Sequence, residues 1–416
     1  MTVNRLQPGG IRSVTLRTVL DELRVSGPLR VADLAGRTSL SRPTVMQAVA
    51  ALEQAGYAAY LAEQEDDPGR PRMGRPARRV RFRTECGYAV GVDIGAHKIL
   101  AVVSDLAGTR VGCVRTVLPG RAAGDELLAA TVGTIRTLLE SASVPVTRLR
   151  AITVGTPGVV DAARGTVTQA PHLNGWPAVP LTAELTEEFG CPVHLDNDVN
   201  LAVQGERAHG VAGRADTVVY VLWGARLGAG LVVNGVLHRG SSGAAGEIGH
   251  IDLGRDGARG SGGDGLGDLE KSVGAATIAR LGRDAARRPG GRLLLERAGG
   301  DPENLDAAAV FAAAADHDPA ALEVVTEVVG RFVTGIAPLF LILDPDLVVL
   351  GGGVSRAGPV LLDLVHRELA GRVLVPPRLA LSSLGEEAVA TGAVHMSVQS
   401  AYETFLAGLA GGTGSS

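Results

Sequence analysis

Apolar residues recur at helical spacing in the N-terminal part of the chain, at Leu16, Val19, Leu20 and Leu23. This spacing predicts a helix that ends at Gly27-Pro28, followed by a short second helix over 31–36. A third helix is predicted after the N-cap residue Ser41. Its apolar face consists of Val45, Val49 and Leu52. Three short helices with a tight turn between the last two fit either a helix-turn-helix or an ordinary three-helix bundle.

Two segments after the third helix alternate between apolar and polar residues, which predicts the strands of a hairpin over 57–62 and 79–83. Between them lies EQEDDPGRPRMGRPARR, where Gly and Pro separate several arginines. A hairpin with an Arg-rich tip resembles the wing of a winged helix. The hairpin therefore favours the helix-turn-helix over the plain bundle.

Beyond residue 83 the chain alternates apolar runs with helical segments. The predicted strands are 88–95, 99–103, 151–158, 193–195, 217–222 and 347–350. Helices are predicted over 181–189 and within 268–341. Because several strands end in glycine or an acidic residue and helices separate them, the pattern predicts α/β lobes with a cleft at the strand ends.

The densest polar cluster beside a predicted core strand is Asp196-Asn197-Asp198, within VHLDNDVNLAVQGE over 193–206. An acid at this place could cap the helix that follows. Alternatively, a buried cluster of two carboxylates and an amide needs a polar partner, and a hydroxyl-rich small molecule is one.

Length and composition limit the classes of protein to which the chain could belong. At 416 residues the chain is expected to form two or three domains. We identify neither an export signal nor an apolar run long enough to cross a bilayer, so we expect a cytoplasmic protein with no membrane contact. The three cysteines, Cys86, Cys113 and Cys191, lie far apart and indicate neither a disulfide framework nor a thiolate metal site.

The formal net charge of −4 is unevenly distributed. Residues 1–83 contain fourteen Arg, no Lys and eight acidic residues, which gives +6 and leaves −10 for the remainder. A basic head on an acidic body indicates a polyanionic partner for the head alone. With the helix pattern, that partner is predicted to be double-stranded DNA, whose base edges Arg42, Thr44 and Gln47 would meet.

Several motifs of the body occur in a fixed order. They are DIGAHK (93–98), GTPGVVD (155–161), HLNGW (172–176), LDNDVNLAVQGE (195–206), GEIGHI (246–251), Leu269-Glu270 and LVVLGGG (347–353). Together they resemble the ROK family of sugar kinases and repressors, many of whose repressors carry an N-terminal winged helix. The resemblance implies an α/β protein with a winged helix-turn-helix over 1–83 and a two-lobed actin-like body. We expect a small lobe over 84–204 plus 393–416 and a large lobe over 205–392.

The resemblance also implies functional residues. Those that match the family's sugar-contacting positions are Asn197, Asp198, Glu247, His250 and Glu270. Asp198 also matches the base of the kinases. From the residues alone, Glu247 and His250 could instead form a structural turn. Gly-Arg-Pro-Ala over 74–77 resembles the element that some repressors place in the minor groove, so Arg75 is expected there.

Two glycine-rich loops depart from the family pattern. Kinases of the family keep Gly-Gly-Thr in the first loop and Gly-Thr-Gly-x-Gly in the second, where backbone amides approach phosphate closely. This chain has Gly95-Ala96-His97 and Gly224-Ala225-Arg226-Leu227-Gly228. The added side chains would crowd that approach, although an arginine could instead pair with phosphate. We therefore expect a protein that is not an enzyme.

The family's zinc site is also altered. Its three cysteines fall on Ser261, Gly263 and Asp268, and its histidine on His250. Because serine and glycine do not replace thiolates, we expect neither zinc nor any other cofactor.

The sequence thus predicts a transcriptional repressor of sugar-related genes, which senses a sugar or sugar derivative and does not phosphorylate it. We expect a homodimer or homotetramer, since two heads would match an inverted-repeat operator. One alternative is an active ATP-dependent sugar kinase with an appended DNA-binding head. Another is a regulator with a vestigial sugar site that responds to a protein.

Overall fold

The computed structural model describes residues 8–61, 78–118, 124–170, 173, 175–254 and 266–411. The N-terminal head contains α1 (Pro8–Ser26), β1 (Leu29–Arg30), α2 (Val31–Thr38), α3 (Arg42–Gln54), β2 (Ala58–Tyr60) and β3 (Arg79–Phe82). The strands form an antiparallel sheet in the order β1-β3-β2. The predicted helices and hairpin are therefore confirmed. The Arg-rich tip of the hairpin, with Arg75, lies outside the described residues.

The small-lobe sheet has the strand order β10-β7-β4-β5-β6. Its strands are β4 (Tyr88–Ile94), β5 (Lys98–Asp105), β6 (Arg110–Val117), β7 (Leu149–Thr156) and β10 (Val193–Asn197). β7 runs parallel to both β4 and β10, so the ends of these strands meet at one edge, where Asp93 pairs with Gly155 and Asn197 with Thr156. The hairpin of β8 (Val159–Asp161) and β9 (Thr166–Gln169) follows that edge.

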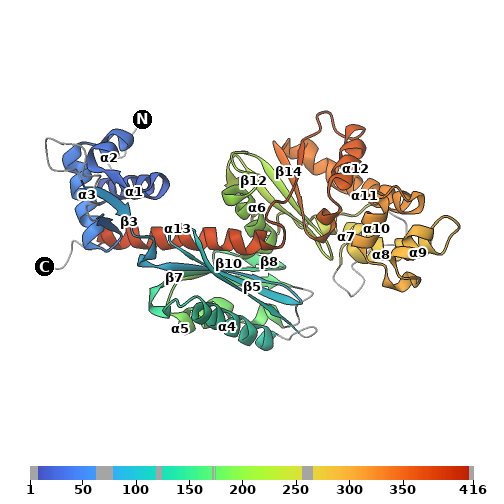
Figure 1. Ribbon diagram of the computed structural model, residues 1–416, viewed down its shortest axis with the longest axis horizontal. Coiled ribbons are helices and arrows are strands. Elements are labelled where there is room, and N and C mark those ends of the chain that lie inside the picture. Colours follow the sequence, from blue (N-terminus) through green and yellow to red (C-terminus); the bar gives the residue numbers. More distant parts are fainter. Residues whose placement is uncertain are drawn as a thin grey trace, which may run out of the picture.

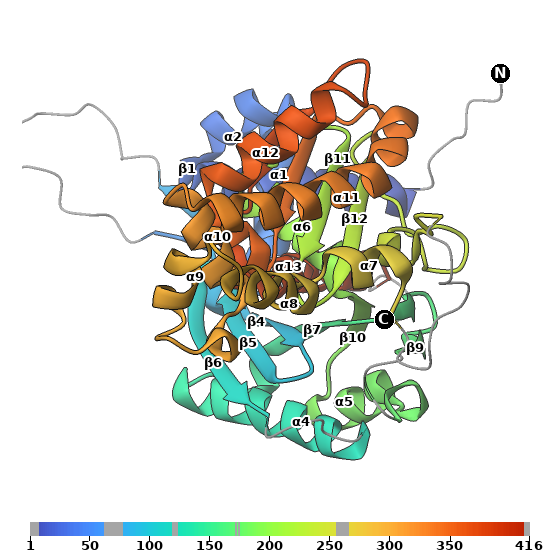
Figure 2. The same cartoon turned by 90° about the vertical axis from the view of Figure 1, so that its right-hand side faces the viewer.

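Helices cover both faces of this sheet. α4 (Gly124–Ser141) and α5 (Leu181–Phe189) lie on one face, and α13 (Ala388–Gly411) crosses the other, as both views show (Figure 1, Figure 2). The near-continuous burial of β4, β5 and β7 follows from this double cover.

The large-lobe sheet has the order β13-β12-β11-β14-β15. Its strands are β11 (Val218–Trp223), β12 (Leu227–Val233), β13 (Val236–Leu237), β14 (Leu347–Gly351) and β15 (Arg378–Leu381). Its helices are α7 (Asp268–Val273), α8 (Ala275–Ala286), α9 (Arg292–Arg297), α10 (Ala307–Ala315), α11 (Pro319–Leu343) and α12 (Pro359–Ala370). Trp223 of β11 is fully buried and stacks on Phe332 of α11 at a centroid distance of 3.9 Å.

The apolar helix α11 amends one sequence-based expectation. By length and composition, this 25-residue helix could cross a membrane. However, Val325, Val328 and Phe332 on its inner face are fully buried in the large-lobe core. The packing accounts for its apolar composition, because a helix with a broad buried face needs few polar residues.

Two helices join the lobes. α6 (Asp198–His209) begins at the end of β10, and it packs against α13 and against β11 and β12. Where α6 and α13 cross, a Cβ at Gly392 would overlap the carbonyl oxygen of Leu201, and one at Gly205 would overlap that of Ala388. The expected lobe limits at 204/205 and 392/393 therefore fall inside these two helices, and the division into lobes stays a proposal.

The head packs directly on α13. Tyr402 and Leu406 belong to the same apolar cluster as Leu20 and Val49 of the head, and the ring of Phe405 stacks on Tyr57 at 3.5 Å. The Tyr402 hydroxyl donates to the carbonyl oxygen of Leu106, 2.5 Å away, in the body. One helix thus connects the head with the region where the lobes meet (Figure 1).

Candidate functional site

The polar stretch after β10 begins with a helix cap. The side-chain oxygen of Asn197 accepts hydrogen bonds from the backbone N–H groups of Val199 (2.8 Å) and Asn200 (3.2 Å). Its amide nitrogen donates to the carbonyl oxygen of Gly158, 3.0 Å away. Asn197 therefore fixes the start of α6 against the turn before β8. The capping role that the sequence suggested for an acid belongs to this amide.

Asp198 is the first residue of α6, and its carboxylate accepts from the N–H of Val199 at 2.8 Å. Burial raises the pKa of Asp198 to about 7, and the nearby charges of Asp93 and Glu247 act in the same direction. Burial also raises the pKa of Asp93, to about 6, against the opposing effect of Lys98. Carboxylates from β4, α6 and the large lobe therefore converge, and Asp93 joins the ligand residues that were predicted from the sequence.

The large-lobe members of the predicted set also lie together. Glu247 precedes the 3-10 turn Ile248–His250, and Glu270 lies on α7. Burial raises the pKa of Glu247; the charge of His250 opposes this effect, and that of Glu270 adds to it. The structure thus brings residues from distant parts of the sequence close enough to influence one another.

Arg226 occupies an unexpected place. Its guanidinium forms an ion pair with Glu270 at 2.8 Å, and the second oxygen of Glu270 accepts from the N–H of Leu227 at 3.1 Å. Both oxygens of a carboxylate that matches a sugar-contacting position are therefore bound by the altered loop. Arg226 had been considered as a clashing side chain or a phosphate partner, and neither possibility included this contact.

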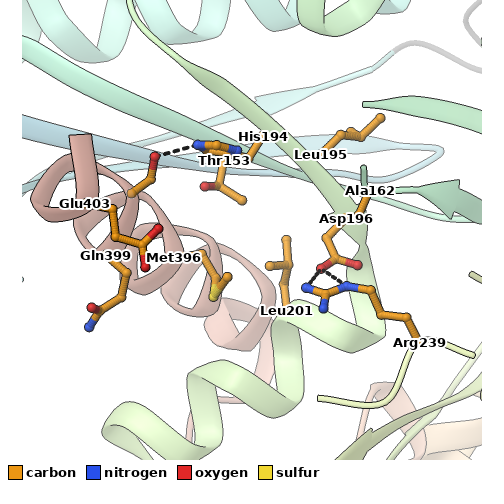
Figure 3. Close-up of a pocket in the computed structure, with 11 residues that line it drawn as sticks. Thr153, Ala162, His194, Leu195, Asp196, Leu201, Arg239, Met396, Gln399 and Glu403 are labelled. Atoms are coloured by element: carbon orange, nitrogen blue, oxygen red, sulfur yellow. Dashed lines mark hydrogen bonds and ion pairs between the residues drawn. The ribbon is translucent and has the colours of Figure 1, made fainter. Parts of the chain in front are cut away.

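A further ion pair crosses between the lobes. Arg239, which follows β13, donates to one oxygen of buried Asp196 through Nε (3.0 Å) and Nη2 (2.6 Å). The other oxygen accepts from the Asn197 N–H (2.8 Å) and from the side-chain amide of Asn200 (3.0 Å). Asp196 thus fixes the strand end that presents Asn197 and Asp198, and it lines a cavity with Arg239 (Figure 3).

The far end of α6 is held by a buried carboxylate that the sequence analysis did not single out. Glu206 is fully buried and accepts hydrogen bonds from the hydroxyls of Ser382 (2.5 Å) and Ser383 (3.1 Å). It also accepts from the N–H groups of Leu384 (3.0 Å) and Val211 (2.9 Å). These bonds attach α6 to the segment that leads into α13, so the two helices are tied together besides crossing closely.

On the head, the predicted recognition residues differ in their contacts. Arg42 and Gln47 are exposed on α3. Thr44 is half-buried and takes part in the helix cap, because its N–H donates to Ser41 Oγ at 3.3 Å and the two hydroxyls lie 2.7 Å apart. Met46, which is 58% exposed, is an additional candidate for contact.

The altered zinc positions are only partly described. Ser261 and Gly263 lie outside the described residues, whereas Asp268 accepts a hydrogen bond from the N–H of Leu253 at 2.9 Å. Within the described ranges, no group of three or more His, Cys, Asp or Glu side chains is placed to hold a metal ion.

Comparison with known proteins agrees with this architecture. Residues 89–400 match the ROK family, and residues 12–58 match the winged helix-turn-helix DNA-binding family. The xylose repressor of Caldicellulosiruptor bescii is 24% identical over 390 residues, which cover 92% of this chain and 94% of the repressor.

Two solved structures are similar to the chain. A ROK family transcriptional regulator, a homologue of the E. coli MLC protein, matches with a TM-score of 0.75 at 22% identity. The match covers 96% of this chain and 99% of the regulator, head included. A ROK family glucokinase from Streptomyces griseus, in complex with glucose and AMPPNP, matches with a TM-score of 0.65 at 29% identity and covers 75% of this chain and 100% of its own.

Proposed function

This chain belongs to the ROK family, and we propose that it is a sugar-responsive, DNA-binding transcriptional repressor that does not phosphorylate its ligand. The observation that carries the proposal is the continuity between the two ends of the molecule. α6 starts at Asp198 and crosses α13, and α13 shares a core with the head.

The side chains predicted to contact the ligand support recognition of a hydroxyl-rich molecule. Asp198 and Glu247 are carboxylates that can accept from ring hydroxyls, and His250 is exposed beside them. Burial raises the pKa of Asp198 to about 7, which favours the neutral carboxyl more than in an exposed aspartate, so this group can donate as well as accept. Asn197 contributes by fixing Asp198, since its own side chain is already bound on both sides.

We also propose that the chain does not transfer a phosphoryl group to its ligand. Arg226 contacts Glu270, so the second loop interacts with the ligand set through a side chain. In the first loop, the Gly95 N–H donates to the carbonyl oxygen of Lys98 at 2.8 Å, which uses one backbone amide that a phosphate could bind.

On the DNA side, Arg42 and Gln47 would read base edges and Arg75 would enter the minor groove. A homodimer or homotetramer would present paired heads to an inverted repeat. Substitution of Arg42 or Gln47 should reduce affinity for the operator by roughly 1–3 kcal/mol and relax base preference at one position.

The test begins with a thermal-shift screen of sugars. Xylose and glucose come first, because the similar proteins are named as a xylose repressor and a glucokinase. Each sugar that binds is then added to the protein on its operator, and DNA release is measured by fluorescence anisotropy. A parallel assay follows ATP consumption with the same sugars. Release without ATP turnover supports the proposal, whereas turnover at rates typical of kinases would assign the chain to the sugar kinases.

A further inference from the structure

A cavity of about 220 Å³ lies beside the middle of α13, and none of the predicted ligand residues lines it (Figure 3). Its apolar lining includes Leu201 of α6, Met396 of α13 and Ala162, which follows β8. The volume is far above the ~15 Å³ that one water needs and below the ~300 Å³ at which drug-sized sites begin. The space therefore suits a small ligand of about one ring.

The rest of the lining is polar. His194 Nε2 and the Ser400 hydroxyl lie 2.5 Å apart, which fixes the imidazole and leaves its second nitrogen available. Gln399 also lines the cavity, and its side chain makes no hydrogen bond with another described residue. Polar and apolar side chains are thus mixed around the space, with Met396 beside Gln399 and Glu403 on α13, and Asp196 and Arg239 near Leu201 (Figure 3).

The charge balance of the cavity disfavours anions. Asp196 is neutralised by Arg239, and burial lowers the pKa of His194, which favours the neutral imidazole. Glu403 is exposed at the rim and forms no ion pair with a described residue. The cavity therefore carries a net negative charge, which disfavours carboxylates and phosphates.

We propose that this cavity is a second small-molecule site, which binds a neutral, polyhydroxylated compound of about one sugar ring. The ring carbons pack on Leu201 and Met396, and hydroxyls pair with His194, Gln399 and Glu403. A saturated ring with hydroxyls at its edge suits a lining that mixes apolar and polar groups, as small-molecule sites commonly do.

The location of the cavity connects it to the DNA-binding head. A ligand there touches β10, α6 and α13, the three elements that connect Asp198 to the head. Tyr402, which packs on the head, follows the lining residue Ser400 by two positions. Occupancy of the cavity therefore changes DNA affinity independently of the ligand between the lobes.

The test uses full-length protein with Asp198→Ala, so that binding between the lobes is disabled. Xylose, glucose and glucuronate are titrated into it by calorimetry. At least one neutral sugar should bind with one site per chain, and glucuronate should bind more weakly. Gln399→Phe, which fills the cavity, should weaken the neutral sugar at least about tenfold, or 1.4 kcal/mol. Thr404→Phe, an exposed position on the same helix that does not line the cavity, should leave affinity unchanged.

Ala162→Phe fills the cavity from the opposite wall and serves if Gln399→Phe disturbs α13. The inference is overturned if no neutral sugar binds the Asp198→Ala protein, or if the filling variants and Thr404→Phe bind the sugar equally well. Neither result bears on the ligand between the lobes, because wild-type protein would still respond to it.

Discussion

Asp198 is a carboxyl group whose protonation should govern stability near neutral pH. Its pKa is raised to about 7 by burial, so between about pH 4 and pH 7 the folded chain holds this proton while the unfolded chain releases it. Stability therefore falls as pH rises through that window. Asp198→Asn cannot ionise, so its melting temperature should fall less between pH 5 and pH 8 than that of the wild type, by a few degrees.

Differential scanning fluorimetry across this pH range measures the effect. Asp93, whose pKa is raised to about 6, acts in the same direction, and Asp198→Asn also removes the charge that Asp93 faces, so both effects flatten the pH dependence of the variant. Asp363→Asn, at an exposed position on α12, is the control and should parallel the wild type. Parallel curves for Asp198→Asn and the wild type would show that Asp198 is not held in the neutral form.

The ion pair between Arg226 and Glu270 provides a second test of individual residues. Arg226→Ala leaves the buried Glu270 carboxylate with only the Leu227 N–H as a described partner. This substitution should lower the free energy of unfolding by about 1–3 kcal/mol. The loss should be smaller than for a fully buried ion pair, because Arg226 is a third exposed. Glu270→Gln in the Arg226→Ala background should recover part of this loss. Denaturant titration of the four proteins yields the coupling energy, and additive effects would contradict the contact.

The sequence indicated these residues but not their contacts. Asn197 and Asp198 were placed at a strand end because the pattern there is local. The pairing of Arg226 with Glu270 joins residues 44 positions apart, and the same holds for Asp196 with Arg239, 43 apart. No spacing rule relates such positions, so only the fold reveals that the altered loop contacts the ligand set.

At the scale of elements, the crossing of α6 and α13 depends on glycine. A Cβ at Gly392 would overlap the Leu201 carbonyl, and α13 cannot move away without leaving β4 and β7, on which it packs. Gly392→Ala should therefore lower stability by about 1–3 kcal/mol. Gly408→Ala on the same helix meets nothing within 4 Å and should be neutral or slightly stabilising, since alanine favours helix more than glycine does. Equal melting temperatures for the two variants would contradict the close crossing.

Local pattern predicted the helices and hairpin of the head and the central strands of both body sheets, but not β6, β12, α4, α12 or this crossing. The strands β4, β7, β10, β11 and β14 were recognised from apolar runs that end in glycine or acid. α13 gave no such signal, because it packs on the sheet, on α6 and on the head at different points and so lacks a single apolar stripe. Its function as a connector follows from tertiary contacts alone.

At the scale of the whole molecule, the head and the body share one apolar cluster and are not joined by a loose linker. Any ligand-induced change in α13 is therefore passed to the head through direct contact. A ligand that changes DNA affinity 100-fold must differ by about 2.7 kcal/mol in its affinity for the two arrangements of the lobes. One or two hydrogen bonds to charged groups, at roughly 1.5–3 kcal/mol each, suffice if they form in only one arrangement.

This coupling predicts that loosening the head from α13 separates ligand binding from DNA release. Phe405→Ala removes the stack on Tyr57, worth roughly 0.5–1.5 kcal/mol beyond the area it buries, while it leaves the ligand residues untouched. Sugar affinity should stay at the wild-type value, and the ratio of operator affinities without and with sugar should fall several-fold. Thr404→Ala, exposed on the preceding position, is the matched control and should keep the full ratio. A Phe405→Ala protein with an unchanged ratio would mean that the signal reaches the head by a route other than α13.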